Sequence, residues 1–425
     1  MTTGHKRMSL TIQILLALGL GGATGIGLNL LGMGVPGTSP AWINQYVIEG
    51  LFAGGGDIFV RALKLMVVPL VFVSLVNGTM QLEDVRKMGR IGIKTFVLYL
   101  LTTALATALA IFFAVLIGPG KGVELVMDSS FSIKSGKSLY DVFVGLVPTN
   151  PVQALAEGDM LQIIVFSILL GMSVTLVGSK GAKVREFFES LNEVVMQLVM
   201  IVMSLAPIGV FCLVGKTFAT QKFELIWALM GYFMTVMFVL FVHMLVTYPT
   251  LLAVLGRLNP VRFFINMKNV IPFAFSTASS SATLPVTLES VEHKMGVDNR
   301  IASFTIPLGA TVNMDGTAIM QGVATVFVAQ VYDVHLGLGG YLTVILMATL
   351  ASIGTAGVPS AGLVMLVMVF EQVGLPVEAI GAILGIDRLL DMTRTAVNVC
   401  GDAAVTAIVA KSENQINLEI YNANN

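Results

Sequence analysis

Charge is what this sequence has least of. Only 12% of its 425 residues are Asp, Glu, Lys or Arg, whereas 56% are hydrophobic. Soluble globular domains carry about twice this charged fraction, so the composition excludes a chain of soluble domains and predicts a membrane protein. The net charge of −1 gives no electrostatic reason to expect a nucleic-acid partner.

Cysteine and histidine are also scarce. The two cysteines, Cys212 and Cys400, lie in apolar surroundings, and the chain has four histidines. A disulfide framework or a zinc site needs such residues at characteristic spacings. A serine hydrolase needs a general base near its nucleophile, and no histidine forms a recognisable motif with the serines. His243, which lies inside a long apolar segment, is interpreted as a packed core residue. We expect neither an enzyme nor a bound cofactor.

Long apolar segments are abundant. A spanning helix needs about 20 apolar residues, and we predict spanning helices at 10–31, 67–76, 96–117, 161–177, 194–214 and 227–255. The first segment is too long for the apolar part of a cleaved signal peptide. Lysines and arginines cluster before the first predicted helix and after the second, fourth and sixth. The positive-inside rule therefore places the N-terminus in the cytoplasm, and we expect the polar C-terminal tail there too.

From about residue 260 the apolar segments are interrupted. FSTASSSATLP (275–285), GATVNMDGT (309–317) and ASIGTAGVPSAG (351–362) break three successive segments. Non-helical backbone survives at membrane depth only where it lines protein or a wet cavity, so such breaks point to a transporter binding site. A broken hairpin followed by a helix with polar groups occurs twice. This order predicts two re-entrant hairpins, each paired with a spanning helix.

The last apolar segment has an acid-rich face. Residues three or four apart share one face of a helix, and this face holds Asp387, Asp391, Arg394, Thr395, Asn398 and Asp402. A water-facing amphipathic helix has the same pattern, but carboxylates inside a membrane cost about 2.5 to 3.5 kcal/mol each and need ligands or ions. Arg394 matches a carboxylate, and Asp391 can hold an ammonium group. The face therefore predicts a site for an acidic zwitterion.

Two further groups of residues complete this prediction. The hydroxyls and backbone amides of Ser279, Ser280 and Ser281 can donate to the α-carboxylate of such a substrate. Oxygen ligands for a cation are offered by Asn313, Asp315, Asn398 and Asp402. Sites made only of oxygen suit alkali or alkaline-earth ions, and sodium is the simplest choice. We expect Gly316 to let the helix unwind beside Asn313 and Asp315.

Four motifs carry a family resemblance. In this order, SSSATLP, GATVNMDGT, ASIGTAGVP and DMTRTAVNVCGD resemble the hallmarks of the dicarboxylate/amino acid:cation symporter family, which includes glutamate/aspartate transporters and excitatory amino acid transporters. The resemblance implies an all-α polytopic membrane protein with eight transmembrane helices, two re-entrant helical hairpins, inverted repeats and an elevator-type mechanism. It also implies a homotrimer among lipids in a cell membrane, for which we expect a bacterial inner membrane. The implied scaffold covers about 8–80 and 140–220, and the transport part about 88–118 and 225–412.

The resemblance also implies roles for individual residues. Arg394 would bind the substrate side-chain carboxylate and Asp391 its amino group. The implied substrate-binding set is Arg394, Asp391, Thr395, Asn398, Thr317, Ser279, Ser280, Ser281, Val358 and Gly362. The implied ligands are Asp402, Asn398, Asn313 and the Gly309 carbonyl for one sodium, carbonyls of Thr311, Ser352, Ile353 and Thr355 for another, and Tyr99, Thr102, Thr103, Asn313 and Asp315 for a third.

This chain departs from the pattern of the family it resembles at three positions. Ala278 stands where prokaryotic members often carry an arginine, and Met392 stands where animal members carry one. We therefore expect Arg388 to pair with a carboxylate when the site is empty. Gln321 stands where potassium-coupled animal members have a glutamate. No potassium counter-transport is therefore expected.

The predicted function is sodium-coupled uptake of L-aspartate or L-glutamate. A proton-coupled symporter of the same substrates is the main alternative, because the fold does not fix the coupling ion. A C4-dicarboxylate symporter is less favoured, because Asp391 provides a partner for an amine. A pure ion channel has no obvious use for Arg394 beside an ammonium-binding carboxylate.

Overall fold

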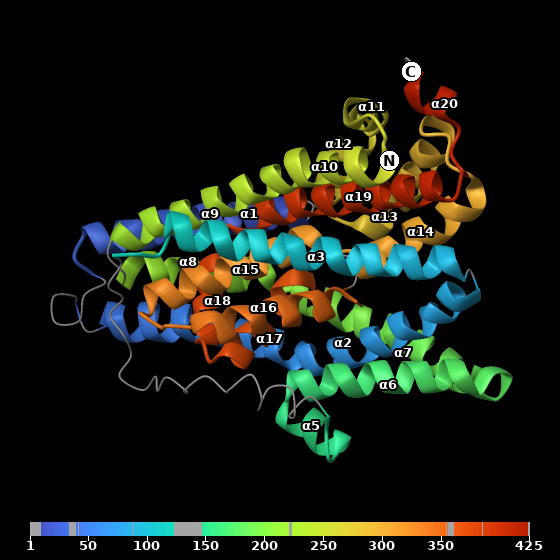
Figure 1. Ribbon diagram of the computed structural model, residues 1–425. Coiled ribbons are helices and arrows are strands. Elements are labelled where there is room, and N and C mark those ends of the chain that lie inside the picture. Colours follow the sequence, from blue (N-terminus) through green and yellow to red (C-terminus); the bar gives the residue numbers. More distant parts are fainter. Residues whose placement is uncertain are drawn as a thin grey trace, which may run out of the picture.

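The structure is a computed structural model, and helices make up its regular structure (Figure 1). It describes residues 10–33, 40, 42–87, 89–122, 147–220, 223–353, 355, 361–384 and 386–423. Within these residues the β-pairing consists of one isolated bridge between Val297 and Ile416. The prediction of an all-α architecture is confirmed.

The first half of the chain supplies most of the long helices, together with a few short ones. They are α1 Leu10–Leu30, η1 Ile43–Ala53, α2 Gly54–Lys87, α3 Arg90–Ile117, α5 Pro151–Glu157, α6 Met160–Val177, η2 Gly178–Gly181, α7 Ala182–Ser204 and α8 Ala206–Thr220. A helical path then runs without a break through α9 Phe223–Val242, η3 His243–Thr247, α10 Tyr248–Leu251 and η4 Leu252–Gly256. Both η3 and η4 are π-helical turns.

The second half is built from shorter pieces. They are α11 Pro260–Asn266, α12 Val270–Thr277, α13 Ser280–Glu289, η5 Ser290–Lys294, α14 Asn299–Val312, α15 Asp315–Val331, α16 Gly337–Ser352, α17 Ala361–Val373, η6 Val377–Ala379 and α18 Ile380–Leu384. The chain ends with the long α19 Asp387–Ser412 and the short α20 Leu418–Asn422.

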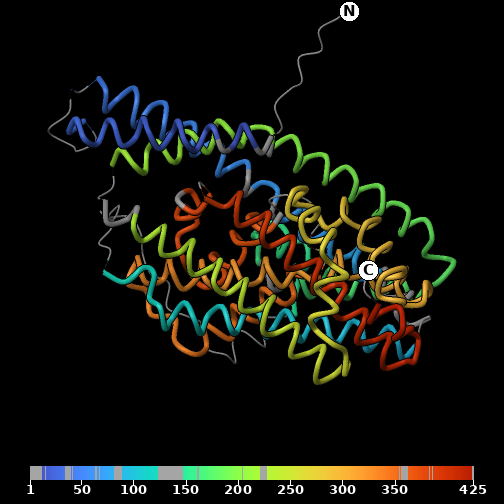
Figure 2. Tube along the Cα trace, turned by 90° about the horizontal axis from the view of Figure 1, so that it is seen from above, coloured from blue at the N-terminus to red at the C-terminus, as the bar shows by residue number. Residues whose placement is uncertain are grey.

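Helix packing divides the molecule into two groups. In the first group, α1 packs along α8, and α2 packs on α6, α7 and α8. Figure 2 shows α1 and α8 side by side at the upper left. In the second group, α15 packs on α3, α9, α16 and α19, while α19 also contacts α12, α13 and α14. The two groups meet where α2 contacts α3 and α17, and where α18 contacts α8.

Four of the described helical stretches are long and apolar enough to cross a membrane: Ile12–Leu30, Arg90–Ile117, Gln162–Val202 and Trp227–Gly256. The prediction of one uninterrupted span over 194–214 is wrong, because α7 ends at Ser204 and α8 begins at Ala206. Pro207 explains the break, since it lacks an amide proton and its ring crowds the carbonyl four residues earlier.

The helix breaks in the structure are shorter than the sequence motifs that predicted them. Between α12 and α13 only Ala278 and Ser279 leave the helix, and Ala278 has a left-handed φ of 49°. Between α14 and α15 only Asn313 and Met314 do so. Gly316 lies inside α15, so the expectation that it unwinds the helix is wrong. A Cβ there would lie 2.6 Å from the Arg394 carbonyl oxygen, so its small size lets α15 approach α19.

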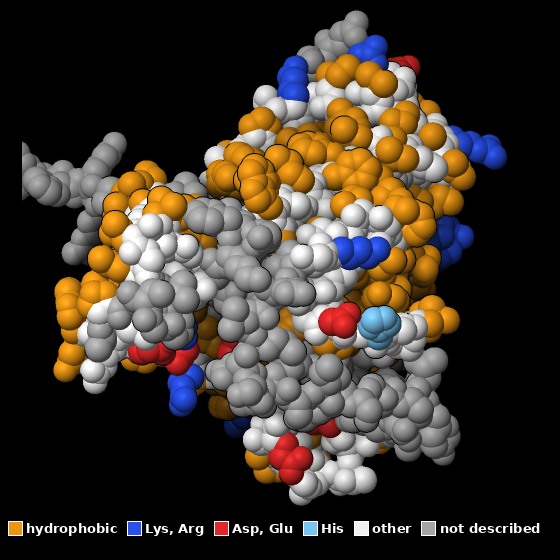
Figure 3. All heavy atoms as spheres, turned by 90° about the vertical axis from the view of Figure 1, so that its left-hand side faces the viewer, with side chains coloured by type: hydrophobic (Ala, Val, Ile, Leu, Met, Phe, Trp, Pro, Cys, Tyr) orange, Lys and Arg blue, Asp and Glu red, His pale blue; other side chains and the backbone are white. Residues whose placement is uncertain are grey.

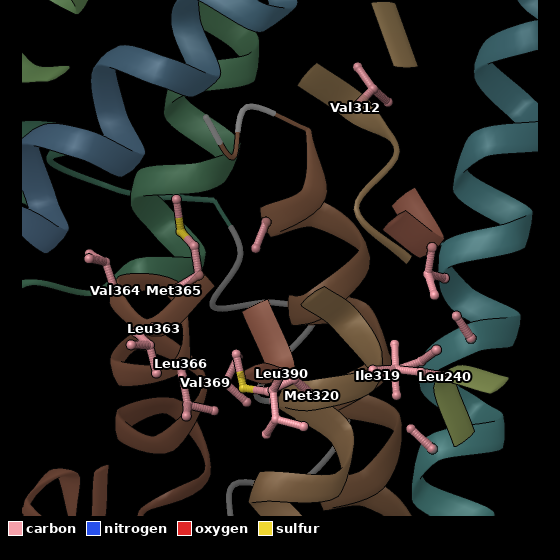
Figure 4. Close-up of a cluster of buried hydrophobic side chains, with 14 of the residues drawn as sticks. Leu240, Val312, Ile319, Met320, Leu363, Val364, Met365, Leu366, Val369 and Leu390 are labelled. Carbon is pink, nitrogen blue, oxygen red and sulfur yellow. The ribbon is translucent and has the colours of Figure 1, made fainter. Parts of the chain in front are cut away.

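The apolar core surrounds these polar breaks. Figure 4 shows a cluster of buried side chains to which α15 contributes Met320, α17 contributes Leu366 and α19 contributes Leu390. Hydrophobic side chains also cover much of the described surface seen in Figure 3, with single charged residues between them. An apolar exterior around a buried polar centre is the arrangement expected of a protein whose solvent is lipid.

Candidate functional site

A buried ion cluster on α19 centres on Arg394. Its side chain is 1% exposed. The guanidinium donates through Nη1 to Asp387 Oδ1 at 2.7 Å, and through Nη2 to Asp391 Oδ1 at 2.8 Å and Asp387 Oδ2 at 3.3 Å. Arg388 Nη1 donates to Asp391 Oδ2 at 3.2 Å. Two acids and two bases thus neutralise one another along one face of the helix.

Asp387 was not among the predicted binding residues. It lies in the same polar face, seven residues or two turns before Arg394, and this spacing was the signal that could have identified it. It is buried, and both of its carboxylate oxygens accept hydrogen bonds from the guanidinium. Arg394 Nε has no hydrogen-bond partner among the described residues. A carboxylate that enters can therefore use this spare donor or replace one of the two aspartates as acceptor.

The serine-rich tip lies at the junction of α12 and α13, and both arms pack on α19. Ser279 caps α13, since its Oγ accepts a hydrogen bond from the Ala282 amide at 3.2 Å. Ser280 is buried and Ser281 is exposed. Their amides belong to the first turn of α13, whose N–H groups have no carbonyl partner within the helix. Thus the hydroxyl of Ser279 caps the helix, while the backbone amides of Ser280 and Ser281 can donate to an anion.

The other predicted substrate residues fall on α15, α17 and α19. A Cβ at Gly362 would lie 2.7 Å from Thr317 Cγ2, so the start of α17 abuts α15. Asn398 Oδ1 accepts from the Gly316 amide at 2.7 Å and ties α19 to the broken helix. The Thr395 hydroxyl donates to the Asp391 carbonyl within α19. Val358 lies outside the described residues.

The first predicted sodium set is gathered in one place. Asn313 Nδ2 donates to Asp402 Oδ1 at 2.9 Å and to the Asn398 carbonyl at 3.2 Å. Gly309 faces the same point, because a Cβ there would lie 2.5 Å from Asp402 Oδ1. Its carbonyl accepts from the Asn313 amide at 2.8 Å. The unwound residue Asn313 thus joins α14 to α19 through oxygen-rich contacts.

The third predicted set surrounds Asp315. Thr103 Oγ1 donates to Asp315 Oδ1 at 2.6 Å, and Thr102 Oγ1 lies 3.3 Å from Asn313 Oδ1. Tyr99 directs its hydroxyl to the Thr305 carbonyl at 3.0 Å and lies 3.5 Å from the Asp402 carbonyl. All of these side chains are buried. Among the described residues, neither Asp315 nor Asp402 forms an ion pair with Lys or Arg.

Two residues that the sequence prediction missed complete the surroundings of Asp315. Tyr248 donates its hydroxyl to Asp315 Oδ2 at 2.8 Å, and His243 Nε2 lies 3.1 Å from the same oxygen. His243 is buried as expected, yet its interpretation as a packing residue alone is incomplete. It lies 72 residues before Asp315, and no local pattern links the two positions.

The residues of the second predicted sodium set lie at and just after the end of α16, with Thr311 near the end of α14. Ser352 and Ile353 end α16, where the last carbonyls have no amide partner within the helix. The hydroxyls of Ser352 and Thr355 donate back to α16, to the Thr349 and Ala351 carbonyls. Within the part of the chain that the structure describes, no hydrogen bond joins Thr311 to this helix end.

The end of α19 is held by a separate ion cluster. Glu413 accepts hydrogen bonds from Arg90 and Lys94 at the start of α3. These hydrogen bonds lower the pKa of the Glu413 carboxyl from its ordinary value of 4.5. The contact links two helices of the second packing group outside the buried site.

Comparison with known proteins gives a consistent result. The model of the sodium:dicarboxylate symporter family matches residues 10–412. Excitatory amino acid transporter 3 of Homo sapiens is 36% identical, with 85% of this chain and 79% of the relative covered. The proton/sodium-glutamate symport protein of Bacillus subtilis is 34% identical, with 85% and 86% covered. An excitatory amino acid transporter of Caenorhabditis elegans is 36% identical, with 83% and 80% covered. With its apolar helices this chain is a multi-pass membrane protein, and it belongs to the sodium:dicarboxylate symporter family.

Proposed function

We propose that this protein is a secondary active symporter that takes up L-aspartate or L-glutamate together with sodium ions. The observation that carries the proposal is the contrast between two buried clusters. Arg394 is neutralised by aspartates and has a spare donor, whereas Asp315 and Asp402 form no ion pair with Lys or Arg among the described residues. The relatives are named as glutamate or excitatory amino acid transporters.

The substrate would bind at the Arg394 cluster. Its side-chain carboxylate would accept from the guanidinium in bidentate geometry, and its ammonium group would donate to Asp391. Thr317, Thr395, Asn398 and the tip amides around Ser280 would bind the α-carboxylate, with Val358 and Gly362 closing the site. This exchange is favourable because a buried arginine keeps an acidic partner throughout.

Sodium would neutralise the two unpaired carboxylates. An uncompensated carboxylate buried in an apolar protein is strongly destabilising, and a hard cation with oxygen ligands removes this cost. Asp402 with Asn313, Asn398 and the Gly309 carbonyl would hold one ion. Asp315 with Tyr99, Thr102, Thr103 and Asn313 would hold another. Carbonyls of Thr311, Ser352, Ile353 and Thr355 would hold a third.

We propose an elevator-type mechanism in a homotrimer, and the division of the helices into two packing groups supports the elevator motion. The first packing group, with α1, α2, α6, α7 and α8, would form the static scaffold. The second group, with α3, α9 and α12 to α19, contains every proposed ligand and would move as one transport unit. The hairpins α12–α13 and α16–α17 would be re-entrant, with both chain termini in the cytoplasm. The trimer would lie in a cell membrane, for which we propose a bacterial inner membrane.

Arg388 would hold Asp391 when no substrate is bound. The observed contact of 3.2 Å gives it this position. Because the Arg388 contact competes with the substrate ammonium group for Asp391, Arg388→Ala is expected to change substrate affinity by a few fold and to alter the transport rate. Arg388→Lys is the charge-preserving control. Unchanged affinity and rate in Arg388→Ala would contradict this role.

Proton coupling is the second candidate. It is favoured by the name of the Bacillus subtilis relative, a proton/sodium-glutamate symport protein, and by the same unpaired carboxylates, which a proton can neutralise as well as sodium can. C4-dicarboxylate symport is less favoured, because such substrates have no ammonium group for Asp391.

The test is uptake of radiolabelled L-aspartate by proteoliposomes with an inward sodium gradient. We expect saturable uptake that unlabelled L-glutamate or L-aspartate inhibits and that equimolar succinate inhibits much less. Arg394→Lys should lose most of this uptake because a lysine cannot reproduce the bidentate fork. Arg61→Lys, on the exposed surface of α2, is the matched control. Uptake of succinate in preference to both amino acids would contradict the proposed substrate.

A further inference from the structure

The π-helical turn η3 brings two side chains onto one carboxylate. His243 and Tyr248 are five residues apart, which would place them about 140° apart around an α-helix. In η3 the Tyr248 amide bonds to the His243 carbonyl, five residues back, so the extra residue rotates both side chains toward the same side. Their rings meet edge to face with centroids 4.6 Å apart.

Both rings point to Asp315. Tyr248 donates at 2.8 Å and His243 Nε2 lies at 3.1 Å from Oδ2, while Thr103 donates at 2.6 Å to Oδ1. His243 Nδ1 has no hydrogen-bond partner among the described residues. The proton of a neutral imidazole therefore belongs on Nε2, where the carboxylate accepts it. Asp315 thus receives three hydrogen bonds from two different helical segments.

We propose that His243 and Tyr248 are positioning residues that weaken sodium binding at Asp315, so that the ion is released after transport. This inference rests on the proposed function. The two donors stabilise the carboxylate most when no cation is bound, because sodium withdraws charge from the oxygens that accept the hydrogen bonds. They therefore stabilise the empty site more than the occupied one.

Ion release is the step that needs such residues. A transporter must bind its ion tightly enough for loading and weakly enough for unloading. A buried carboxylate without other donors would hold sodium too strongly, because its empty state would be an unsatisfied buried charge. Two neutral donors satisfy that state without adding a charge that would repel the ion.

The experiment measures the half-saturating sodium concentration for L-aspartate uptake at alkaline pH. We expect Tyr248→Phe and His243→Leu each to lower it about fivefold, the effect of one lost hydrogen bond. His243→Gln keeps a donor near the position of Nε2 and should retain the wild-type value. Tyr421→Phe is the matched control, because this tyrosine is fully buried on α20 and donates its hydroxyl to the Asn259 carbonyl outside the site.

A second measurement does not require transport. Sodium raises the melting temperature of a protein that binds it only when folded, so the sodium concentration at which Tm begins to rise in detergent reports affinity. This rise should begin at lower sodium in Tyr248→Phe and His243→Leu than in the wild type. An unchanged or higher half-saturating concentration in both variants would overturn the inference. If wild-type uptake did not depend on sodium, the proposed function would fail instead.

Discussion

The two buried polar clusters are built in opposite ways. The Arg394 cluster lies within one helix and consists of two full charges of each sign at spacings of three and seven residues. The Asp315 cluster joins α3, η3, α10 and α15, and among the described residues its contacts come from two hydroxyl groups and a histidine ring instead of from Lys or Arg. The charges of the first cluster therefore balance without a ligand, whereas the carboxylate of the second cluster would be balanced by a bound cation.

This difference suits the two clusters to bind different ligands. A neutral cluster can exchange one internal carboxylate for that of a substrate at little electrostatic cost. A carboxylate that has no arginine or lysine partner gains more from a cation than one that is already in an ion pair. Under the proposed function, substrate recognition and ion coupling follow from how each buried charge is compensated.

Removal of Arg394 should have the largest effect. Arg394→Ala leaves Asp387 and Asp391 as buried acids without their main partner, which costs about 3–5 kcal/mol of unfolding free energy. We expect loss of uptake and a lower Tm in detergent. The exposed Arg61 on α2 supplies the control variant Arg61→Ala. Wild-type uptake by Arg394→Ala would show that the cluster does not bind the substrate.

Asp315→Asn should separate ion binding from substrate recognition. Asparagine keeps the shape but loses the charge, so the half-saturating sodium concentration should rise by at least about tenfold. Sodium titrations of substrate binding to the purified protein measure this change. Asp298→Asn, at the partly exposed cap of α14, should leave the titration unchanged. A wild-type sodium response in Asp315→Asn would remove Asp315 from the ion site.

Gly316→Ala should damage both clusters together. The added methyl group would lie 2.6 Å from the Arg394 carbonyl oxygen and 2.8 Å from its Cα, and would push α15 away from α19. Overpacking of this kind costs about 1–3 kcal/mol. Tm and the affinities for sodium and substrate should all fall. Gly27→Ala, where nothing lies within 4 Å, is the control, and equal effects of both changes would contradict the close approach.

Glu413→Gln should have the smallest effect. The hydrogen bonds from Lys94 and Arg90 lower the pKa of this carboxyl, so its stabilising contribution is present above the ordinary value of 4.5 and is lost as the pH falls through the lowered value. Because Arg90 is largely exposed, we expect a Tm change of about 2 °C or less near neutral pH. The difference between wild type and variant should vanish in acid, and a difference that grew there would reverse this sign.

The two clusters also differ in how far the sequence predicts them. The polar face of α19 was predictable, because helix periodicity places Asp391 and Arg394 together. The contact of His243 with Asp315 was not, because it depends on a π-helical turn and on packing between segments far apart in the chain. The family resemblance, confirmed by the family model, predicts Asp315 as a ligand but says nothing of its histidine and tyrosine partners.

Glycine and proline in the sequence predicted one helix break only in part and left another unpredicted. The break at Asn313 was predicted from a motif, but it was attributed to Gly316, whose role is close packing against α19. The break at Leu205 was missed although Pro207 marks it, because apolar composition alone suggested a continuous span. Hydropathy indicates whether a segment lies in the membrane, whereas proline and glycine indicate where its helix bends or packs closely.

The most direct test of sodium coupling compares two gradients across proteoliposomes that contain the wild-type protein. Uptake of radiolabelled L-aspartate is measured with an inward sodium gradient, and separately with an inward proton gradient in choline buffer. The two-cluster account predicts uptake with sodium and none with protons alone. Uptake driven by protons alone would contradict it, and would make Asp315 or Asp402 a proton carrier.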